Sequence, residues 1–142
     1  MVNDKGALEK EFQRKYLQLQ LYKHQLNAYA EEKGKIDNRI AELRMTIDAL
    51  ENIGKINKGE EIWSPLGSST FVMSDIKDTE NVLVNIGAGV VIKSTRQRSI
   101  EILQSRLDEI EDVSRSLIAE MVKYSEEVEK LEPEVQKLAQ ML

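Results

Sequence analysis

Two heptad runs of equal length bracket the chain, and they constrain its fold more than any other feature. Apolar residues recur at alternating three- and four-residue steps from Leu8 to Leu50 and again from Ile100 to Leu142, with thirteen core positions in each run. Eleven positions of the first run and twelve of the second are apolar, a pattern typical of coiled coils. Each helix would be roughly 64 Å long at 1.5 Å per residue and would bury only a narrow seam. Such a helix needs a partner of matching length, and the chain carries one.

Signals for the ends of both helices predict how the chain turns. Gly54 is placed to act as a left-handed C-terminal stop for the first helix, and Ser94 with Gln97 three residues later is a candidate capping box for the second. The helices should then fold back as an antiparallel pair in which facing residue numbers sum to about 150. This register predicts that Leu8 lies near Leu142 and that both termini meet at one tip.

Polar residues interrupt the predicted seam at a few positions. Lys33 and Ser114 fall in adjacent layers of the seam. One interpretation is that a long seam tolerates these polar residues. The other is that Lys33, helped by Gly34, weakens the seam locally and fixes its register. Pro133 lies at an outward heptad position near the end of the second helix. It should kink or fray the last turn and a half.

The middle of the chain has the period of β-strands. Four short β-favouring runs between residues 62 and 92 are separated by Pro-, Gly- and Asp-containing turns, which predicts two β-hairpins in series. Several of these runs carry apolar residues on both faces of the strand, so both faces must be buried. Four short strands and one pair of helices cannot bury them. We therefore expect an obligate oligomer in which strands of several subunits close a barrel. The strand residues expected to lie in that shared sheet are Ile62, Trp63, Phe71, Val82, Val84, Ile86, Val90 and Ile92.

These patterns predict an α+β fold, a long antiparallel two-helix coiled coil with two central β-hairpins that join an intersubunit β-barrel. The expected segments are an N-terminal helix at 1–54, the hairpins at 55–93 and a C-terminal helix at 94–142, in one structural domain. Trp63 and Phe71 are expected to seat the first hairpin on the base of the helices.

Composition argues against an enzyme. The chain has 32% charged residues, no Cys, and a single histidine, His24, at an outward heptad position, so we expect no metal, cofactor or catalytic residue. Gly87-Ala88-Gly89 is interpreted as a hairpin turn rather than a phosphate loop. The net charge of -5 with interleaved signs disfavours nucleic acid as a partner. Without a signal peptide or a long apolar run, we expect a cytoplasmic protein that contacts no membrane.

The order of long helix, two hairpins and long helix resembles that of the alpha subunits of archaeal prefoldin. The resemblance is carried by Trp63-Ser64-Pro65-Leu66-Gly67 and by the segment from Val84 to Lys93, which contains the Gly-x-Gly turn. Two hairpins, where beta subunits of the family have one, favour the alpha type. Lys93 departs from the acidic residue that is more frequent at the end of the last strand in this family.

The resemblance implies an ATP-independent holdase in which two alpha and four beta subunits form a double β-barrel with six coiled-coil tentacles. Their tips would grip non-native polypeptides and pass them to a group II chaperonin. The residues expected to contact such clients are Val2, Leu8, Phe12, Leu138, Met141 and Leu142. In another interpretation, the heptad members of this set only complete the seam.

A structural tether or scaffold is the alternative function. It would need an apolar stripe outside the seam, for which the sequence offers only Leu17, Leu21 and Ile118.

Overall fold

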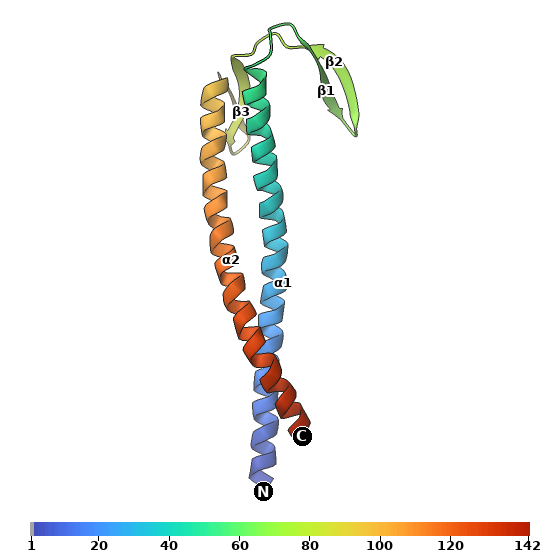
Figure 1. Ribbon diagram of the computed structural model, residues 1–142, viewed down its shortest axis with the longest axis vertical. Coiled ribbons are helices and arrows are strands. Elements are labelled where there is room, and N and C mark those ends of the chain that lie inside the picture. The colour runs from blue at the N-terminus through green and yellow to red at the C-terminus, as the bar shows by residue number, and fades with distance from the viewer. Residues whose placement is uncertain (1) are drawn as a thin grey trace. The chain divides into compact units, whose positions relative to one another are not determined.

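The computed structural model describes residues 2–142, with side chains from residue 4 onward. Two long helices precede and follow two antiparallel hairpins along the chain, which confirms the predicted α+β arrangement of elements (Figure 1). The joining of these hairpins to strands of other subunits remains a proposal. The elements are α1 Val2–Ile53, β1 Glu61–Gly67, β2 Thr70–Asp75, β3 Asn81–Gly87, β4 Val90–Thr95 and α2 Arg96–Met141.

The residues group into two compact units. The terminal unit comprises 1–38 and 111–142, and the central unit comprises 39–110. Each unit contains a segment of both helices, and both hairpins belong to the central unit. Each has its own small hydrophobic core.

In the central unit, the C-terminal part of α1 packs on the N-terminal part of α2. The buried cluster joins side chains of both helices and is bordered by half-buried apolar residues, among them Val82 of β3. The pair that the antiparallel register predicts, Leu43 with Leu107, lies in this cluster. Its buried members are Leu43, Ile47, Leu50, Leu103 and Leu107.

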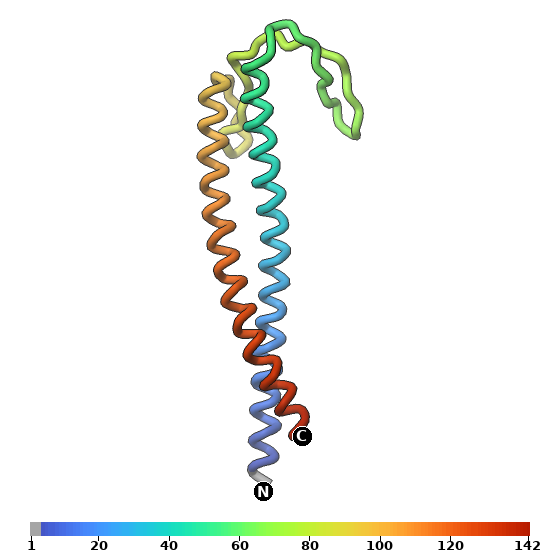
Figure 2. Tube along the Cα trace, viewed as in Figure 1, coloured from blue at the N-terminus to red at the C-terminus, as the bar shows by residue number. Residues whose placement is uncertain are grey.

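In the terminal unit, α1 and α2 again run side by side in opposite directions (Figures 1 and 2). Leu19 of α1 forms a buried cluster with Leu131 and Val135 of α2, and Phe12, Tyr22 and Val128 pack against it. Leu19 and Leu131 are also partners in the predicted register. The antiparallel pairing is therefore confirmed within each unit.

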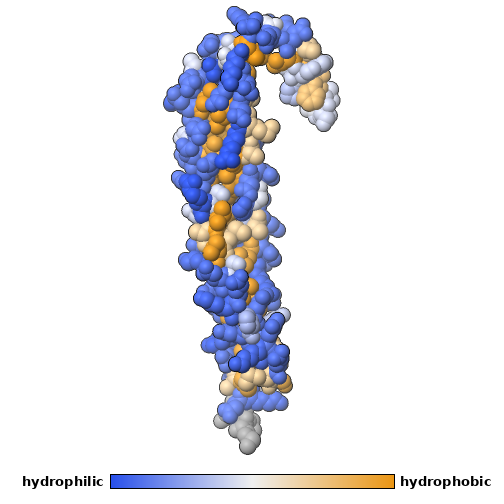
Figure 3. All heavy atoms as spheres, in the orientation of Figure 1, coloured by the Kyte–Doolittle hydropathy of each residue, from blue (hydrophilic) through white to orange (hydrophobic). Residues whose placement is uncertain are grey.

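The heptad prediction agrees closely with burial. All thirteen predicted core positions of the first run are buried or half-buried, as are twelve of the thirteen in the second. Apolar side chains accordingly follow the line between the helices (Figure 3). The exception is Leu142, which lies beyond the end of α2 and is exposed. The seam therefore ends before the position that was expected to face Leu8.

The predicted helix signals near the hairpins need correction. Gly54 directly follows α1, but it does not have the positive φ of a left-handed stop. At the other end, the Oγ1 of Thr95, not Ser94, accepts a hydrogen bond of 3.1 Å from the backbone N–H of Arg98. Thr95 is thus the N-cap of α2, because its side chain reaches the third N–H of the helix.

Pro133 does not fray α2, which continues as a helix to Met141. Since Pro has no N–H, the carbonyl of Glu129 loses its helical partner, but Leu131 and Val135 on either side of Pro133 are buried against Leu19. Packing of the apolar face therefore keeps the helix together. The predicted fraying was wrong.

Each hairpin is a separate two-stranded sheet. A register shift between Pro65 and Gly67, or between Asn85 and Gly87, precedes a two-residue loop. Positive φ angles occur at both loop residues, Ser68-Ser69 in the first hairpin and Ala88-Gly89 in the second. Two successive positive φ values define the type I′ turn, whose twist matches that of paired strands. The prediction of two tight hairpins is confirmed.

Candidate functional site

The first hairpin exposes most of its apolar side chains. The register pairs Trp63 with Met73 and Pro65 with Phe71, so these four residues share one face of the two-stranded sheet. Trp63 is 65% exposed and Phe71 is 57% exposed, and together they line a shallow apolar hollow. These two aromatic residues were expected to seat the hairpin on the helices, and that prediction was wrong because nothing in the described chain covers them.

The opposite face of the first hairpin combines polar and apolar side chains. The hydroxyl groups of Ser64 and Ser74 form a hydrogen bond across the strands, and the neighbouring Ile62 and Val72 are exposed. An isolated two-stranded hairpin is at best marginally stable in water. This hairpin therefore presents one apolar face, one mixed face with exposed Ile62 and Val72, and two open edges.

The second hairpin packs on the helices of the same unit. Val84 of β3 is 7% exposed, and Val82 borders the central core. A guanidinium N–H of Arg106 in α2 donates a hydrogen bond to the backbone carbonyl of Asn85, which holds β3 against the helix. Of the predicted assembly residues, the chain itself covers Val82 and Val84. The other six, Ile62, Trp63, Phe71, Ile86, Val90 and Ile92, are exposed.

The predicted client-contacting residues differ in exposure. Leu8, Phe12 and Leu138 are half-buried, and Phe12 packs against the terminal core and stacks on Tyr16 with ring centroids 5.8 Å apart. Met141 and Leu142 are 58% and 49% exposed. The side chain of Val2 lies outside the described residues. The last two residues of the chain are thus the freest apolar contacts among the candidates.

Two ion pairs join the helices beside the terminal core. The Nζ of Lys15 lies 2.9 Å from Glu134, and the Nζ of Lys23 lies 2.8 Å from Glu132. The hydrogen bond that Lys15 donates to Glu134 raises the pKa of Lys15, and Glu11 adds to the effect. Because these pairs lie at the surface, each contributes little to stability.

Comparison with known families matches residues 22–141 to the family described as Prefoldin subunit. The chain belongs to the prefoldin subunit family. The predicted resemblance to archaeal alpha subunits is confirmed, since curated proteins named Prefoldin subunit alpha match most of the chain. That of Methanococcus vannielii is 29% identical over 132 residues, covering 93% of this chain and 88% of that protein. That of Methanosarcina barkeri is 28% identical over 139 residues, covering 98% and 92%.

Solved structures share the fold of this prefoldin subunit. A filamentous PFD from Methanocaldococcus jannaschii, determined by cryo-EM, aligns with a TM-score of 0.71 at 18% identity, covering 82% of this chain and 96% of that one. The prefoldin beta subunit from Thermococcus strain KS-1 aligns with a TM-score of 0.58 at 17% identity, covering 89% and 90%. Membership in this family implies a chaperone-type function rather than catalysis.

Two features are absent from residues 2–142. No helix there is both long and apolar enough to cross a membrane. In the same part of the chain, no three His, Cys, Asp or Glu side chains are grouped so that they could hold a metal ion. His24 is exposed, as its heptad position predicts.

Sequence reasoning missed one feature of the terminal unit, a group of three tyrosines. Tyr22 and Tyr29 of α1 and Tyr124 of α2 were each assigned to the seam as apolar residues. In the structure their rings meet across the helix pair. The antiparallel register could have revealed this group, since 22 and 29 flank the position that faces 124.

Proposed function

We propose that this prefoldin subunit is part of an ATP-independent holdase that binds non-native polypeptides at the free ends of its coiled coil, prevents their aggregation and delivers them to a group II chaperonin. It would do so in a hetero-oligomer with beta-type subunits, with two alpha and four beta chains as the expected composition. The hairpins would form the shared base of this assembly.

The exposure of Met141 and Leu142 at the end of α2 carries the client-binding part of the proposal. Burying each such side chain against a client contributes at most about 1.5–3 kcal/mol, which is weak and not specific for sequence. Met adapts readily to partners of different shape. Several ends in one assembly would add their contacts as avidity, so that clients are held without any chemical step.

The exposed apolar faces of the first hairpin support the assembly part of the proposal. Trp63 and Phe71 are large side chains that remain open to solvent in the single chain, next to strands with unpaired edges. Strands from other subunits would cover both the faces and the edges. In such an arrangement, the apolar side chains on both sides of these short hairpins would be removed from water, which would stabilise the hairpins.

Removal of residues 1–7 and 136–142 tests the client-binding part. This cut leaves the terminal core intact, because Leu19, Leu131 and Val135 all remain. We expect the trimmed chain to assemble with a beta-type subunit but to lose suppression of aggregation when a chemically unfolded protein is diluted into buffer without ATP. Light scattering and complex mass measure the two properties together.

A matched pair of substitutions separates the ends from general surface hydrophobicity. Met141→Gln should weaken suppression, whereas Met45→Gln, at an exposed position of α1 in the central unit, should not. Full suppression by the trimmed chain would overturn the proposal that clients bind at the ends. Transfer of the held client on addition of a group II chaperonin tests delivery.

The alternative of a tether or scaffold has one observation in its favour. Leu17 and Leu21 are both exposed and lie four residues apart, so they form an apolar pair on the outer side of α1. If the protein is a scaffold, substitution of both leucines with Gln should abolish binding of its partner. Removal of the ends should leave that binding unchanged. The aggregation assay therefore distinguishes the two functions.

A further inference from the structure

The tyrosine group of the terminal unit forms an unusual part of the seam. The rings of Tyr22 and Tyr124 meet at a centroid distance of 5.3 Å and an angle of 68°, and those of Tyr29 and Tyr124 at 5.7 Å and 55°. Such edge-to-face and tilted contacts are favourable for aromatic pairs. All three side chains are half-buried, so part of each ring remains open to solvent.

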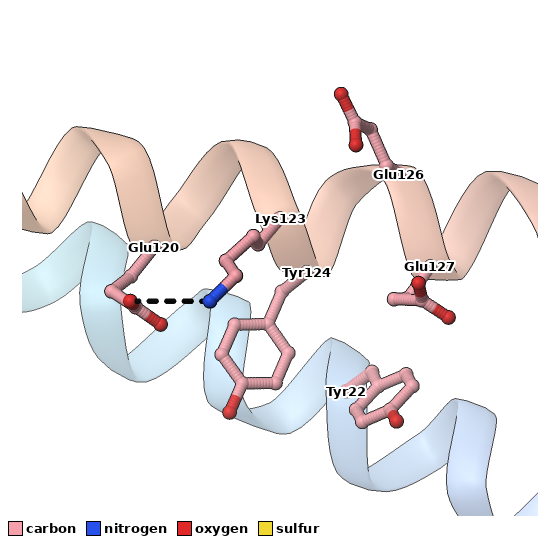
Figure 4. Close-up of a pocket in the computed structure, with 6 residues that line it drawn as sticks. All are labelled: Tyr22, Glu120, Lys123, Tyr124, Glu126 and Glu127. Carbon is pink, nitrogen blue, oxygen red and sulfur yellow. Dashed lines mark ion pairs between the residues drawn. The ribbon is translucent and has the colours of Figure 1, made fainter.

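A hollow of about 320 Å³ lies beside this group and is lined by Tyr22, Tyr124 and four charged residues of α2. The rings of Tyr22 from α1 and Tyr124 from α2 both border it, whereas the Glu126 carboxylate points away from α1 (Figure 4). The hollow thus has aromatic walls contributed by both helices and a charged rim contributed by α2.

The rim of the hollow is predominantly negative. It carries the carboxylates of Glu120 and Glu127 and one ammonium group, that of Lys123, while Glu126 lines the hollow with its carboxylate turned away from α1. Lys123 is largely exposed, and its Nζ lies 3.8 Å from Glu120, at the outer limit of an ion pair. The Nζ of Lys130, outside the lining, lies 3.8 Å from Glu127. Because both ion pairs are at this outer limit and Glu126 adds a third carboxylate, the two lysines neutralise the lining only in part.

Aromatic faces next to carboxylates form the chemical environment that binds a cationic side chain. An ammonium or guanidinium group gains from the negative face of a tyrosine ring and from the nearby carboxylates, whereas an anion would be repelled by both. The Trp63–Phe71 hollow of the central unit carries no charged lining residue and offers no such preference.

We propose that the tyrosine hollow binds arginine or lysine side chains of non-native polypeptides. The inference rests on the proposed holdase function for the identity of the ligand, and it adds a second contact, selective for charge, to the unselective apolar contacts at the ends. A client held at both places gains affinity by avidity. Basic residues, which are rarely buried in folded proteins, would then contribute to recognition as well as apolar ones.

Titration with matched peptides tests this site. The probes are a short unstructured peptide of glycine, serine and leucine that carries arginine, and the same peptide with citrulline, which has nearly the shape of arginine but no charge. We expect the full-length chain in its assembled form to bind the arginine peptide about threefold to tenfold more tightly at low salt. The preference should shrink as salt is added. Equal affinity for the two peptides at low salt would overturn the proposal.

Single substitutions test which residues cause the preference for the arginine peptide. Glu127→Gln and Tyr124→Leu should each reduce the preference for the arginine peptide. Because Glu127 lies outside the seam, a folding defect cannot account for the effect of Glu127→Gln. Lys123→Gln removes the competing cation and should increase the preference. Glu129→Gln, an exposed residue of the same helix outside the hollow, is the control and should leave it unchanged. A preference that survives Glu127→Gln and Tyr124→Leu would place the site elsewhere and refute the assignment.

Parallel measurement of aggregation suppression keeps this inference separate from the proposed function. If the chain prefers the arginine peptide but suppresses no aggregation, the holdase proposal fails and the cation site stands. If it suppresses aggregation without preferring arginine, the holdase proposal stands and the cation site fails.

Discussion

At the scale of one residue, Gly54 permits a close contact directly after α1, because glycine has no Cβ. A Cβ atom built on Gly54 would lie 2.5 Å from the Cζ of Arg96, and both guanidinium nitrogens at the end of that side chain would be 2.7 Å away. The Nε of Arg96 is buried. Glycine at this position therefore leaves room for the guanidinium to pass close to the backbone, and it does not provide a left-handed conformation.

Gly54→Ala should lower stability by up to about 1 kcal/mol, because the flexible Arg96 side chain must move away and lose its packing. Thermal unfolding of a double-mutant cycle with Arg96→Ala measures this effect, since Gly54→Ala should cost nothing once Arg96 is gone. As a control, Gly34→Ala fills open space inside α1 and should stabilise the chain by up to about 1 kcal/mol. An equal cost of Gly54→Ala with and without Arg96 would contradict the explanation.

Asp78 organises the link between the two hairpins. Its carboxylate accepts hydrogen bonds from the side-chain amide of Asn81 and from the backbone N–H groups of Glu80 and Asn81. These bonds, the one from the Asn81 side chain first, lower the pKa of Asp78 from 3.8 to about 2, with a smaller contribution from Lys93. The link between β2 and β3 thus depends on an ionised side chain.

A carboxyl group with a lowered pKa stabilises the folded state above its unfolded pKa and loses this contribution as the pH falls through its folded value. For Asp78 the loss should occur between pH 3.8 and about 2. Asp78→Asn should therefore lower the melting temperature near neutral pH and make little difference near pH 2. A melting difference between wild type and variant that is constant with pH would contradict this role.

At the scale of the elements, the second hairpin turn departs from the ideal for its type. Ala88 occupies a position with φ of 50°, which costs a residue with a Cβ roughly 1–2 kcal/mol relative to Gly. Ala88→Asn would give the Asn-Gly pair that type I′ turns favour. We expect it to raise stability by about 0.5–1 kcal/mol, measured by thermal unfolding, whereas Ala88→Val should lower it.

The interpretation of Lys33 as a weak point of the seam in the terminal unit can be tested by substitution. Its Nζ pairs with Asp37 of the same helix at 2.6 Å, and its side chain borders an open hollow lined by Leu26, Met121 and Val122. Lys33→Leu would replace a surface ion pair worth about 0.3–0.5 kcal/mol with apolar contacts in this hollow. A net gain of about 1 kcal/mol is expected, and an unchanged or lower melting temperature would show that the lysine does not weaken the seam.

The helices and turns could be predicted from sequence because their signals are local and repeated. Heptad spacing identified the buried side of both helices, and the Gly-containing turns identified both hairpins. The orientation of Trp63 and Phe71 could not be predicted in this way, because periodicity tells which residues share a face but not what covers that face. The tyrosine hollow was missed for a related reason, since each ring fits the heptad pattern and only the pairing of helices brings the rings together.

At the scale of the whole molecule, the apolar surface of the first hairpin is the strongest argument for assembly. Trp63 and Phe71 are both more than half exposed, and the open strand edges beside them favour pairing with further strands. A charged side chain at the centre of such a surface would remain unpaired after burial, which is costly. Trp63→Glu should therefore prevent assembly with a beta-type subunit while the helices keep their circular dichroism. Met45→Glu, at another exposed apolar position, should leave the mass of the complex unchanged.

The single tryptophan of the chain also reports on this surface directly. Trp63 is 65% exposed in the isolated chain, so its fluorescence should resemble that of tryptophan in water. If neighbouring strands cover the first hairpin, addition of a beta-type subunit that lacks tryptophan should shift the emission to shorter wavelength and protect the ring from quenching by iodide. The shift should follow the same concentration dependence as complex mass in sedimentation, because one event produces both. Formation of a stable complex without any change in Trp63 emission would mean that the subunits join elsewhere and that the first hairpin remains free for another partner.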